Sequence, residues 1–335
     1  MKAFRWLGWP LAIVYASVMT LRNWMFDRGI FTSMPLPKNT IGVGNLSVGG
    51  TGKSVVVNYL IQESKSLGKT AVLSRGYGRK TRGYILADSS ATATTIGDEP
   101  FQFWKRHPDI WVAVAEKRRV GIQKLVELQN PPSYIILDDV FQHRWVRPQK
   151  MILCTRFDAL YSHDYVFPMG RLRESTQGKK RADICLVTNC PADLEAAKRL
   201  EIAQQLQWKD SKTLIFTTIT YADQLLGRSV MAPEELKKEP LVVVTGFAKP
   251  ERFLNFLRSQ GFEFTSFCYP DHHNFKPQEI EQIEQAAQGG NILTTEKDYG
   301  RLGPQINSEN LYYWPIELEF LSPQDKGLFD QNIWG

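Results

Sequence analysis

A glycine-rich segment, Gly42–Ser54, is the feature that most limits what this chain can fold into. It follows a short apolar run and precedes a helix-like run, Val55–Leu67, which is the strand–turn–helix context of a phosphate-binding P-loop. Ser47 stands where the strict P-loop pattern has glycine, but the core Gly49–Ser54 keeps that pattern. We therefore predict a nucleoside triphosphate site here; the alternative is a glycine-rich turn beside a surface lysine.

The residue types in this segment suit a nucleotide with a bound metal ion. Glycines allow a tight turn that aims several backbone N–H groups at one anion. Lys53 is expected to reach the β- and γ-phosphates of ATP, and Ser54 to place its hydroxyl on Mg²⁺. The predicted nucleotide-binding residues are Ser47, Val48, Gly49, Gly50, Thr51, Gly52, Lys53 and Ser54.

Apolar β-like runs alternate with helix-like runs along most of the chain after Pro37. This alternation predicts an α/β fold in which a mostly parallel sheet, of the RecA-like P-loop NTPase type, is covered by helices on both faces. The charged, proline-bounded stretch Pro233–Pro240 indicates a change of domain, and a smaller α/β unit follows it. The predicted divisions are an N-terminal membrane-associated helix (1–30), a P-loop domain (31–212), a connecting ribbon (213–239) and the smaller α/β domain (240–335).

An uncharged apolar run, Trp6–Leu21, lies near the N-terminus between basic residues. It is shorter than the about 20 residues that a spanning helix needs, and longer than the about 10–14 typical of a core or interfacial segment. Trp6, Trp9 and Trp24 flank it, as aromatic residues do at a membrane–water boundary. We favour an interfacial, shallowly inserted anchor; a buried core helix, a single span and a cleaved signal peptide are the alternatives.

Composition restricts the function only loosely. The 335 residues carry a formal net charge of +6, with 43% hydrophobic and 23% charged residues, which is ordinary for a globular protein. The positive charge favours an anionic partner, such as a nucleic acid, an anionic membrane or a phosphorylated substrate. No recognisable nucleic-acid-binding module accompanies the charge, so we expect no nucleic-acid partner.

An apolar strand-like run, Tyr134–Leu137, ends in two carboxylates, Asp138 and Asp139. A strand of this kind downstream of a P-loop is typical of a Walker B segment, in which an aspartate holds Mg²⁺ directly or through water. The spacing leaves open which of the two carboxylates contacts the metal, and an acidic strand-to-loop transition is the alternative interpretation.

Two further segments place polar side chains near the predicted phosphate site. Arg75 lies in the glycine-punctuated segment Ser74–Arg79, where its guanidinium can bind phosphate oxygens; a flexible basic loop is the alternative. Asp98 opens a predicted helix, which makes it either a helix cap or the carboxylate that takes a proton from an acceptor hydroxyl.

Polar segments also occur later in the chain. Arg173 is expected to hold phosphate, and Glu174 either to help with Mg²⁺ or to orient Arg173, unless the two form a surface salt bridge. In the second domain, His272 lies within the polar segment Asp271–Asn274 and is placed to polarise a carboxylate base. An exposed, solvated pair of histidines is the alternative.

Taken in order, these motifs resemble those of the tetraacyldisaccharide 4'-kinase family, the lipid A 4'-kinases of Gram-negative envelopes. The resemblance implies transfer of the γ-phosphoryl group of ATP to the 4'-hydroxyl of tetraacyldisaccharide 1-phosphate, on the cytoplasmic side of the inner membrane. The N-terminal apolar helix belongs to the family pattern too. The matching segments are Gly44–Leu46, Gly49–Ser54, Ser74–Gly78, Gly97–Pro100, Arg119-Val120, Asp138-Asp139, Gln142-His143, Gly170–Glu174, Asp271–His273 and Thr295–Asp298.

The resemblance also implies residue roles. Asp98 becomes the catalytic base, supported by His272, while Lys53 and Ser54 hold the nucleotide and Mg²⁺. The residues expected near the metal are Ser54, Asp138, Asp139 and Glu174, and those expected to contact phosphate or substrate are Arg75, Arg119, His143 and Arg173.

A membrane-associated P-loop ATPase switch is the alternative function. Switches of this type share the glycine-rich core, but many carry an extra lysine before the glycine pair, where this chain has Val48. An ATPase switch would also not need the second domain with its polar segment Asp271–Asn274. The sequence therefore favours the kinase, with ATP and Mg²⁺ as cofactors and with a lipid substrate and the membrane surface as partners.

Overall fold

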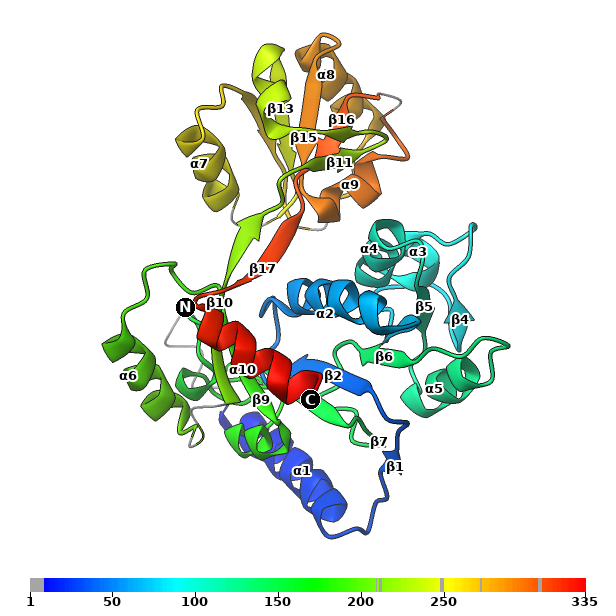
Figure 1. Cartoon of the computed structure of the whole chain (residues 1–335), viewed down its shortest axis with the longest axis vertical. Helices are drawn as coiled ribbons and strands as arrows, with labels where there is room; N and C mark the ends of the chain where they lie inside the picture. The colour runs from blue at the N-terminus through cyan, green and yellow to red at the C-terminus, as the bar shows by residue number, and fades with distance from the viewer. Residues whose placement is uncertain (1–8, 209, 211–212, 248–249, 272, 307–308) are drawn as a thin grey trace.

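The computed structural model describes residues 9–208, 210, 213–247, 250–271, 273–306 and 309–335. Two sheets organise this part of the chain, and Figure 1 shows them as a lower and an upper lobe joined by a two-stranded ribbon. In the described residues, the larger sheet has the order β17 (Ile316–Phe320), β10 (Leu214–Tyr221), β9 (Ile184–Thr188), β8 (Lys150–Arg156), β2 (Thr40–Asn45), β6 (Tyr134–Leu137), β3 (Thr70–Ser74), β5 (Trp111–Val114) and β4 (Ile85–Leu86).

The larger sheet is parallel except at its two edges, where β4 and β17 run antiparallel to their neighbours. Its central strand, β2, pairs with β8 on one side and β6 on the other. The α/β fold with a mostly parallel sheet is therefore confirmed. The strand that ends in the paired aspartates, β6, lies directly beside the P-loop strand β2, and the RecA-like type of the sheet stays a prediction.

Helices cover both faces of the larger sheet, and each face has its own core. On one face, Leu60 of α2 (Lys53–Leu67) and Phe103 of α4 (Asp98–Arg106) pack in a cluster with Ile41 of β2. The buried, β-branched and leucine-rich strands between these layers are what a sheet covered on both sides requires. The other helices around this sheet are α3 (Ala93–Ile96), α5 (Arg118–Val126), α6 (Ala196–Leu206) and α10 (Pro323–Ile333).

The smaller lobe repeats this architecture on a reduced scale. Its central strands run parallel, and its core fills both sides of the sheet. Its described strands have the order β12 (Val230–Met231), β11 (Leu225–Gly227), β16 (Leu311–Tyr313), β15 (Asn291–Thr294), β13 (Leu241–Thr245) and β14 (Thr265–Cys268), with helices α7 (Glu251–Ser259), α8 (Pro277–Ala287) and α9 (Glu296–Leu302).

The chain crosses between the lobes twice, along β10 and β17. The start of β10 pairs with β9 in the larger sheet, whereas Thr217–Tyr221 pairs antiparallel with β17. After β17 the chain stays with the larger lobe, where Phe329 of α10 packs in the cluster that contains Ile41. The predicted divisions at residues 213 and 240 stay predictions, and we propose that the larger domain also includes residues 316–335.

The N-terminal helix α1 (Trp9–Asp27) lies against the lower end of the larger lobe (Figure 1). It continues past the apolar run into polar residues, and a short parallel pair, β1 (Met34–Pro35) with β7 (Val146–Arg147), holds the segment that follows. Within the described residues, no helix has both the length and the hydropathy that crossing a membrane requires. Most apolar side chains of α1 are exposed, so a buried core helix is not what the structure shows.

Candidate active site

The P-loop has the geometry that its glycines predict. It links β2 to α2, whose first residue is Lys53. Gly52 caps the helix with φ of 77°, and a Cβ at this position would lie 3.2 Å from the side chain of Thr188 at the end of β9. Only glycine adopts this conformation without strain. Behind the loop, the Asn45 side-chain amide donates to Thr51 Oγ1 at 2.8 Å.

Lys53 faces Asp139, a carboxylate that the sequence predicted for the site, and Ser54 faces Glu99, which it did not. Lys53 is buried, and its Nζ lies 3.4 Å from Asp139 Oδ1. Ser54 donates from Oγ to Glu99 Oε1 at 2.6 Å. Glu99 follows Asp98 at the start of α4, so this hydrogen bond fixes the start of that helix beside the P-loop.

The paired aspartates differ in their surroundings, although they are neighbours in sequence. Asp138 is buried; Ser74 Oγ donates to its Oδ2 at 2.8 Å, and its Oδ1 has no hydrogen-bond partner among the described residues. Burial, together with the charges of Glu99 and Asp139, raises the pKa of Asp138. Burial also opposes ionisation of Asp139, but Lys53 and Arg173 outweigh it and hold the pKa of Asp139 below its usual range.

The acidic and hydroxyl side chains beside the P-loop suit a Mg²⁺ ion only as a partial set of ligands. The described residues contain no cluster of three or more His, Cys, Asp or Glu side chains arranged as a metal site. Mg²⁺ usually takes only one or two carboxylates from the protein and completes its shell with water and phosphate oxygens. The unpartnered oxygen of Asp138, the adjacent Asp139 and the hydroxyl of Ser54 form such a partial set.

A basic cluster lies next to the paired aspartates. Arg118 is buried and donates to the backbone oxygens of Ala115 and Asp138. Burial, then the charges of Arg118 and Arg75, lowers the pKa of His143 to about 4, so this imidazole is neutral at pH 7. Arg75 and His143 were predicted from the sequence, but Arg118 was not. Its position just beyond β5, at the same sheet edge as Arg75, is the signal that could have found it.

Arg119 lies outside this cluster. Its Nε donates to the Trp145 backbone oxygen at 2.9 Å and its Nη2 to the Thr32 oxygen at 2.5 Å, while the guanidinium covers the Trp145 ring at 5.0 Å. These contacts hold α5 against the segment after α1. They give Arg119 a structural role that needs no contact with a substrate.

Arg173 and Glu174 lie in the segment between β8 and β9, and Arg173 contacts one of the paired aspartates, Asp139. Arg173 Nη1 donates to both carboxylate oxygens of Asp139, at 3.0 and 2.8 Å. Glu174 is buried and accepts hydrogen bonds from Asn23, Gln142 and Arg181. Because both of its oxygens are engaged, Glu174 fits the orienting role better than the metal-binding role.

Asp98, the expected base, lies where the two lobes meet. Its carboxylate forms an ion pair with Arg301 of α9. His272, its expected supporter, lies outside the described residues. The neighbouring residues of the same segment have their own partners: Asp271 pairs with Lys297 at 2.7 Å, and His273 lies 2.8 Å from Glu279.

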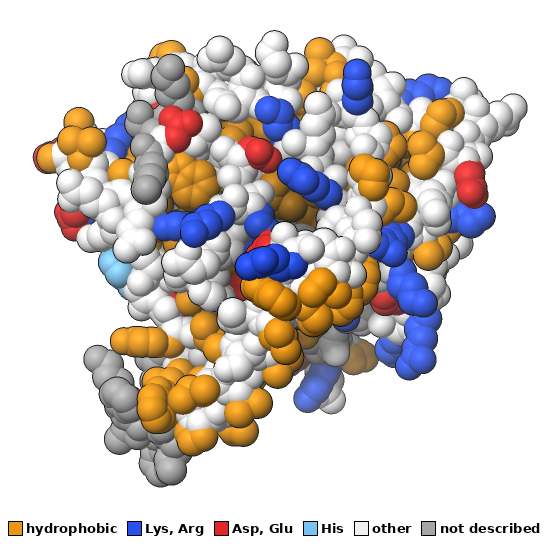
Figure 2. All heavy atoms as spheres, turned by 90° about the horizontal axis from the view of Figure 1, so that it is seen from below, with side chains coloured by type: hydrophobic (Ala, Val, Ile, Leu, Met, Phe, Trp, Pro, Cys, Tyr) orange, Lys and Arg blue, Asp and Glu red, His pale blue; other side chains and the backbone are white. Residues whose placement is uncertain are grey.

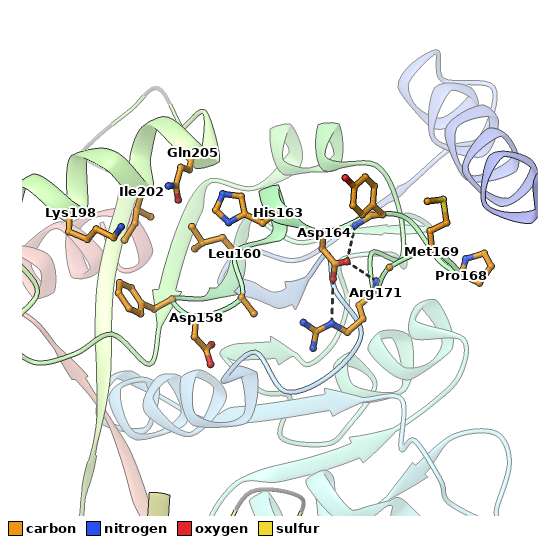
Figure 3. A pocket seen from close by; sticks show the side chains of 14 residues that line it. Asp158, Leu160, His163, Asp164, Pro168, Met169, Arg171, Lys198, Ile202 and Gln205 are labelled. Carbon is orange, nitrogen blue, oxygen red and sulfur yellow. Dashed lines mark hydrogen bonds and ion pairs between the residues drawn. The ribbon is translucent and has the colours of Figure 1, made fainter. Parts of the chain in front are cut away.

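A cavity of about 890 Å³ adjoins the P-loop on the side of β8 and β9, away from Asp98. Figure 3 shows its lining, which comes from the segment after β8 and from α6, with Phe157, Leu160 and Ile202 among charged side chains. The Arg171 backbone oxygen accepts from Val48 N of the P-loop at 2.7 Å, which places the cavity wall against the phosphate-binding loop.

The fold and the site define a P-loop nucleotide-binding protein with an added α/β lobe. The model of the family described as "Tetraacyldisaccharide-1-P 4'-kinase" matches residues 4–333. The chain therefore belongs to the tetraacyldisaccharide-1-P 4'-kinase family.

Relatives and a solved structure agree with this membership. The tetraacyldisaccharide 4'-kinase of Flavobacterium johnsoniae is 41% identical, over 99% of this chain and 97% of its own. That of Bacteroides thetaiotaomicron is 38% identical, over 100% of this chain and 93% of its own. A crystal structure of LpxK from Aquifex aeolicus, described as in complex with ATP, superimposes with a TM-score of 0.79 at 26% identity, covering 98% of this chain and 99% of that one.

Proposed function

We propose that this protein transfers the γ-phosphoryl group of ATP to the 4'-hydroxyl of tetraacyldisaccharide 1-phosphate, a step of lipid A biosynthesis. One observation carries the proposal beyond family membership: the Ser54–Glu99 hydrogen bond joins the P-loop to the helix that begins with Asp98. A lysine for phosphate and a carboxylate for the acceptor hydroxyl thus belong to one site, as phosphoryl transfer requires.

Each residue has a proposed role in the transfer. Lys53 binds the β- and γ-phosphates, and the N–H groups of the P-loop cradle them. Asp98 orients the acceptor hydroxyl and takes its proton, with His272 supporting it. Arg173, together with the Arg75, Arg118 and His143 cluster, stabilises the negative charge that spreads over the phosphoryl oxygens.

We propose Ser54, Asp138 and Asp139 as the residues that hold Mg²⁺. The ion, when bound, neutralises charge on the phosphate oxygens. The unpartnered, buried Oδ1 of Asp138 supports this set, because an anionic oxygen without a donor is costly to bury. Glu174 is left out of the set, because its oxygens already accept three protein hydrogen bonds.

The acceptor is a lipid, and α1 presents the surface that meets its membrane. Leu11, Val14, Val18 and Leu21 are between 56% and 67% exposed, which is unusual for a helix attached to a globular lobe. Figure 2 shows hydrophobic side chains gathered on this face, with lysine and arginine side chains beside them. An apolar face with basic neighbours suits the interface of an anionic membrane. We propose peripheral attachment to the inner membrane, with both lobes on the cytoplasmic side and no nucleic-acid partner.

The test is phosphate transfer from labelled Mg·ATP to tetraacyldisaccharide 1-phosphate in mixed micelles. We expect a labelled bisphosphorylated lipid with the wild-type protein, and a loss of at least about 100-fold in its rate of formation with Lys53→Ala or Asp98→Asn. Asp98→Asn should leave ATP affinity within a few-fold of wild type. ATP consumption without labelled lipid would favour a membrane-associated ATPase switch, and full turnover of Asp98→Asn would refute the base assignment.

A further inference from the structure

The buried carboxylate of Glu174 links the N-terminal helix to the phosphate site. It is 1% exposed and accepts from three donors. Arg181 Nη2 and Gln142 Nε2 reach its Oε1 at 2.8 and 3.0 Å, and Asn23 Nδ2 of α1 reaches its Oε2 at 2.7 Å. A residue of the exposed apolar helix therefore supplies one of the three donors of this buried anion.

From Glu174 the hydrogen bonds continue to the P-loop. Gln142 accepts at Oε1 from Arg173 Nη1 at 3.3 Å, and the same Nη1 reaches both oxygens of Asp139. Asp139 in turn lies 3.4 Å from Lys53. The Gln142 amide also donates to the backbone oxygen of Asn45, the last residue of the P-loop strand, at 2.9 Å.

Two more contacts hold α1 to the same residues. Tyr15 donates from its hydroxyl to the Arg173 backbone oxygen at 2.8 Å, and Arg22 Nη2 donates to the Gln142 backbone oxygen at 3.0 Å. The polar face of α1 thus contacts three consecutive members of the hydrogen-bonded chain, while its apolar face stays exposed.

We propose that Asn23 and Glu174 are positioning residues, through which α1 holds Gln142 and Arg173 in the orientation that phosphoryl transfer needs. The inference rests on the proposed function. Without the Asn23 donor, one oxygen of a buried carboxylate loses its partner, and Glu174 turns to find another. Gln142 follows because it shares that carboxylate, and Arg173 then loses its fixed geometry at Asp139.

The experiment compares Asn23→Asp with wild type in detergent mixed micelles, where membrane attachment is not limiting. Ionised aspartate keeps the shape of asparagine but has no hydrogen to donate, and its charge opposes that of Glu174. We expect kcat to fall about tenfold, the loss corresponding to one hydrogen bond to a charged group, while the KM for ATP changes less than about twofold. Binding to phospholipid vesicles should equal that of wild type. Thr20→Ala, an exposed α1 variant, is the matched control and should have wild-type kinetics.

A double variant separates positioning from a general structural defect. On an Arg173→Gln background, Asn23→Asp should cause no further loss of kcat, because Asn23 acts through Arg173. Multiplied losses would show that Asn23 only stabilises the fold and would overturn the inference, as would a wild-type kcat for Asn23→Asp.

An unfolded variant and an inactive wild-type protein are the two outcomes that the kcat comparison alone does not resolve. If Asn23→Asp lowers the thermal unfolding midpoint below the assay temperature, Glu174→Gln decides, since it replaces one accepting oxygen of this side chain with an amide that cannot accept. An unchanged kcat in Glu174→Gln would then refute the inference. If the wild-type protein makes no labelled lipid, the proposed function fails, and this inference fails with it. An active wild type with an unaffected Asn23→Asp variant overturns the inference alone.

Discussion

Asp138 and Asp139 show how two neighbouring residues of one type acquire different chemistry. The backbone turns at Asp139, with φ of 47°, and sends the two carboxylates to different surroundings. Asp138 enters the sheet interior, and burial with nearby carboxylates raises its pKa. Asp139 faces Lys53 and Arg173, which hold its pKa low. The sequence locates the pair, but it cannot predict this division, because Lys53 and Arg173 reach Asp139 from distant parts of the chain.

The residues that the sequence analysis missed share one property. Glu99 lies within the recognised segment Gly97–Pro100 and Arg118 adjoins Arg119-Val120, but neither has a spacing typical of a particular chemistry. Their roles arise from contacts with Ser54 and with the backbone of Asp138. Lys53, in contrast, is predictable because all parts of a P-loop are contiguous. The functional residues of a contiguous motif can thus be predicted from one sequence. The residues of a site that folding assembles from distant segments can be predicted only in part.

His107 makes the stability of the protein depend on pH. It is buried at the end of α4, and its Nε2–H donates to Asn58 Oδ1 at 3.1 Å. Burial, then the charges of Arg106 and Lys65, lowers its pKa from 6.5 to about 4. The imidazole therefore stays neutral in the folded protein while the unfolded chain takes up a proton below about pH 6.5. The free energy of unfolding should fall as the pH decreases from about 6.5 to 4, by up to about 1.4 kcal/mol per unit from this residue.

Urea unfolding at several pH values measures this dependence. His107→Gln keeps a donor for Asn58 but does not titrate. The free energy of unfolding of this variant should therefore change less steeply with pH than that of wild type, because up to one proton fewer is taken up on unfolding. An unchanged slope in His107→Gln would refute the assignment.

At the scale of elements, α1 was predicted from its apolar run, but its polar end sets its position. The run Trp6–Leu21 indicated a helix, and the observed helix extends to Asp27. Arg144 donates to the Asn23 backbone oxygen and pairs with Asp27, which fixes the end of the helix on the lobe. Hydropathy alone does not reveal such anchoring, because the partners lie more than 100 residues away.

The exposed face of α1 predicts a sensitivity to charge. Val14→Asp places a carboxylate in the middle of the apolar face, where contact with lipid would desolvate it. We expect its affinity for vesicles of anionic phospholipid to fall about tenfold, and transfer to vesicle-borne acceptor to fall with it. Val230→Asp is the matched control, because Val230 is 60% exposed, against 62% for Val14, and lies in the other lobe. Equal loss of vesicle binding in both variants, or in neither, would contradict the attachment through α1.

At the scale of the whole molecule, the lobes are joined in more than one place within the described residues. One connection is the β10–β17 ribbon, and another is the packing of α4 against α9. In the second, Arg106 of α4 donates to Glu296 of α9 at 3.1 Å, with 5% and 14% of the two side chains exposed. The sequence predicted both lobes, but not their contact, which depends on surfaces and not on periodicity.

The Arg106–Glu296 ion pair predicts that the double variant is more stable than the variant that lacks the arginine alone. Arg106→Met leaves Glu296 buried without its counter-ion and should cost about 3 kcal/mol of stability. Adding Glu296→Leu should restore at least half of that loss, since the unpaired charge is gone. Thermal and urea unfolding measure both effects, with Arg258→Met, an exposed arginine, as the control. A double variant less stable than Arg106→Met would show that the charge of Glu296 is not the cause.

The return of the chain to the larger lobe has a consequence for biosynthesis. The ribosome makes the strands of the larger sheet up to β10 first, then the entire smaller lobe, and only afterwards α10, whose Phe329 and Ile333 complete the core around Ile41. During translation, the hydrophobic surface of the larger lobe that α10 will cover therefore stays exposed while the smaller lobe is synthesised. Nascent chains stalled before residue 323 should expose that face to chaperones, although the P-loop and every proposed catalytic residue have already been synthesised.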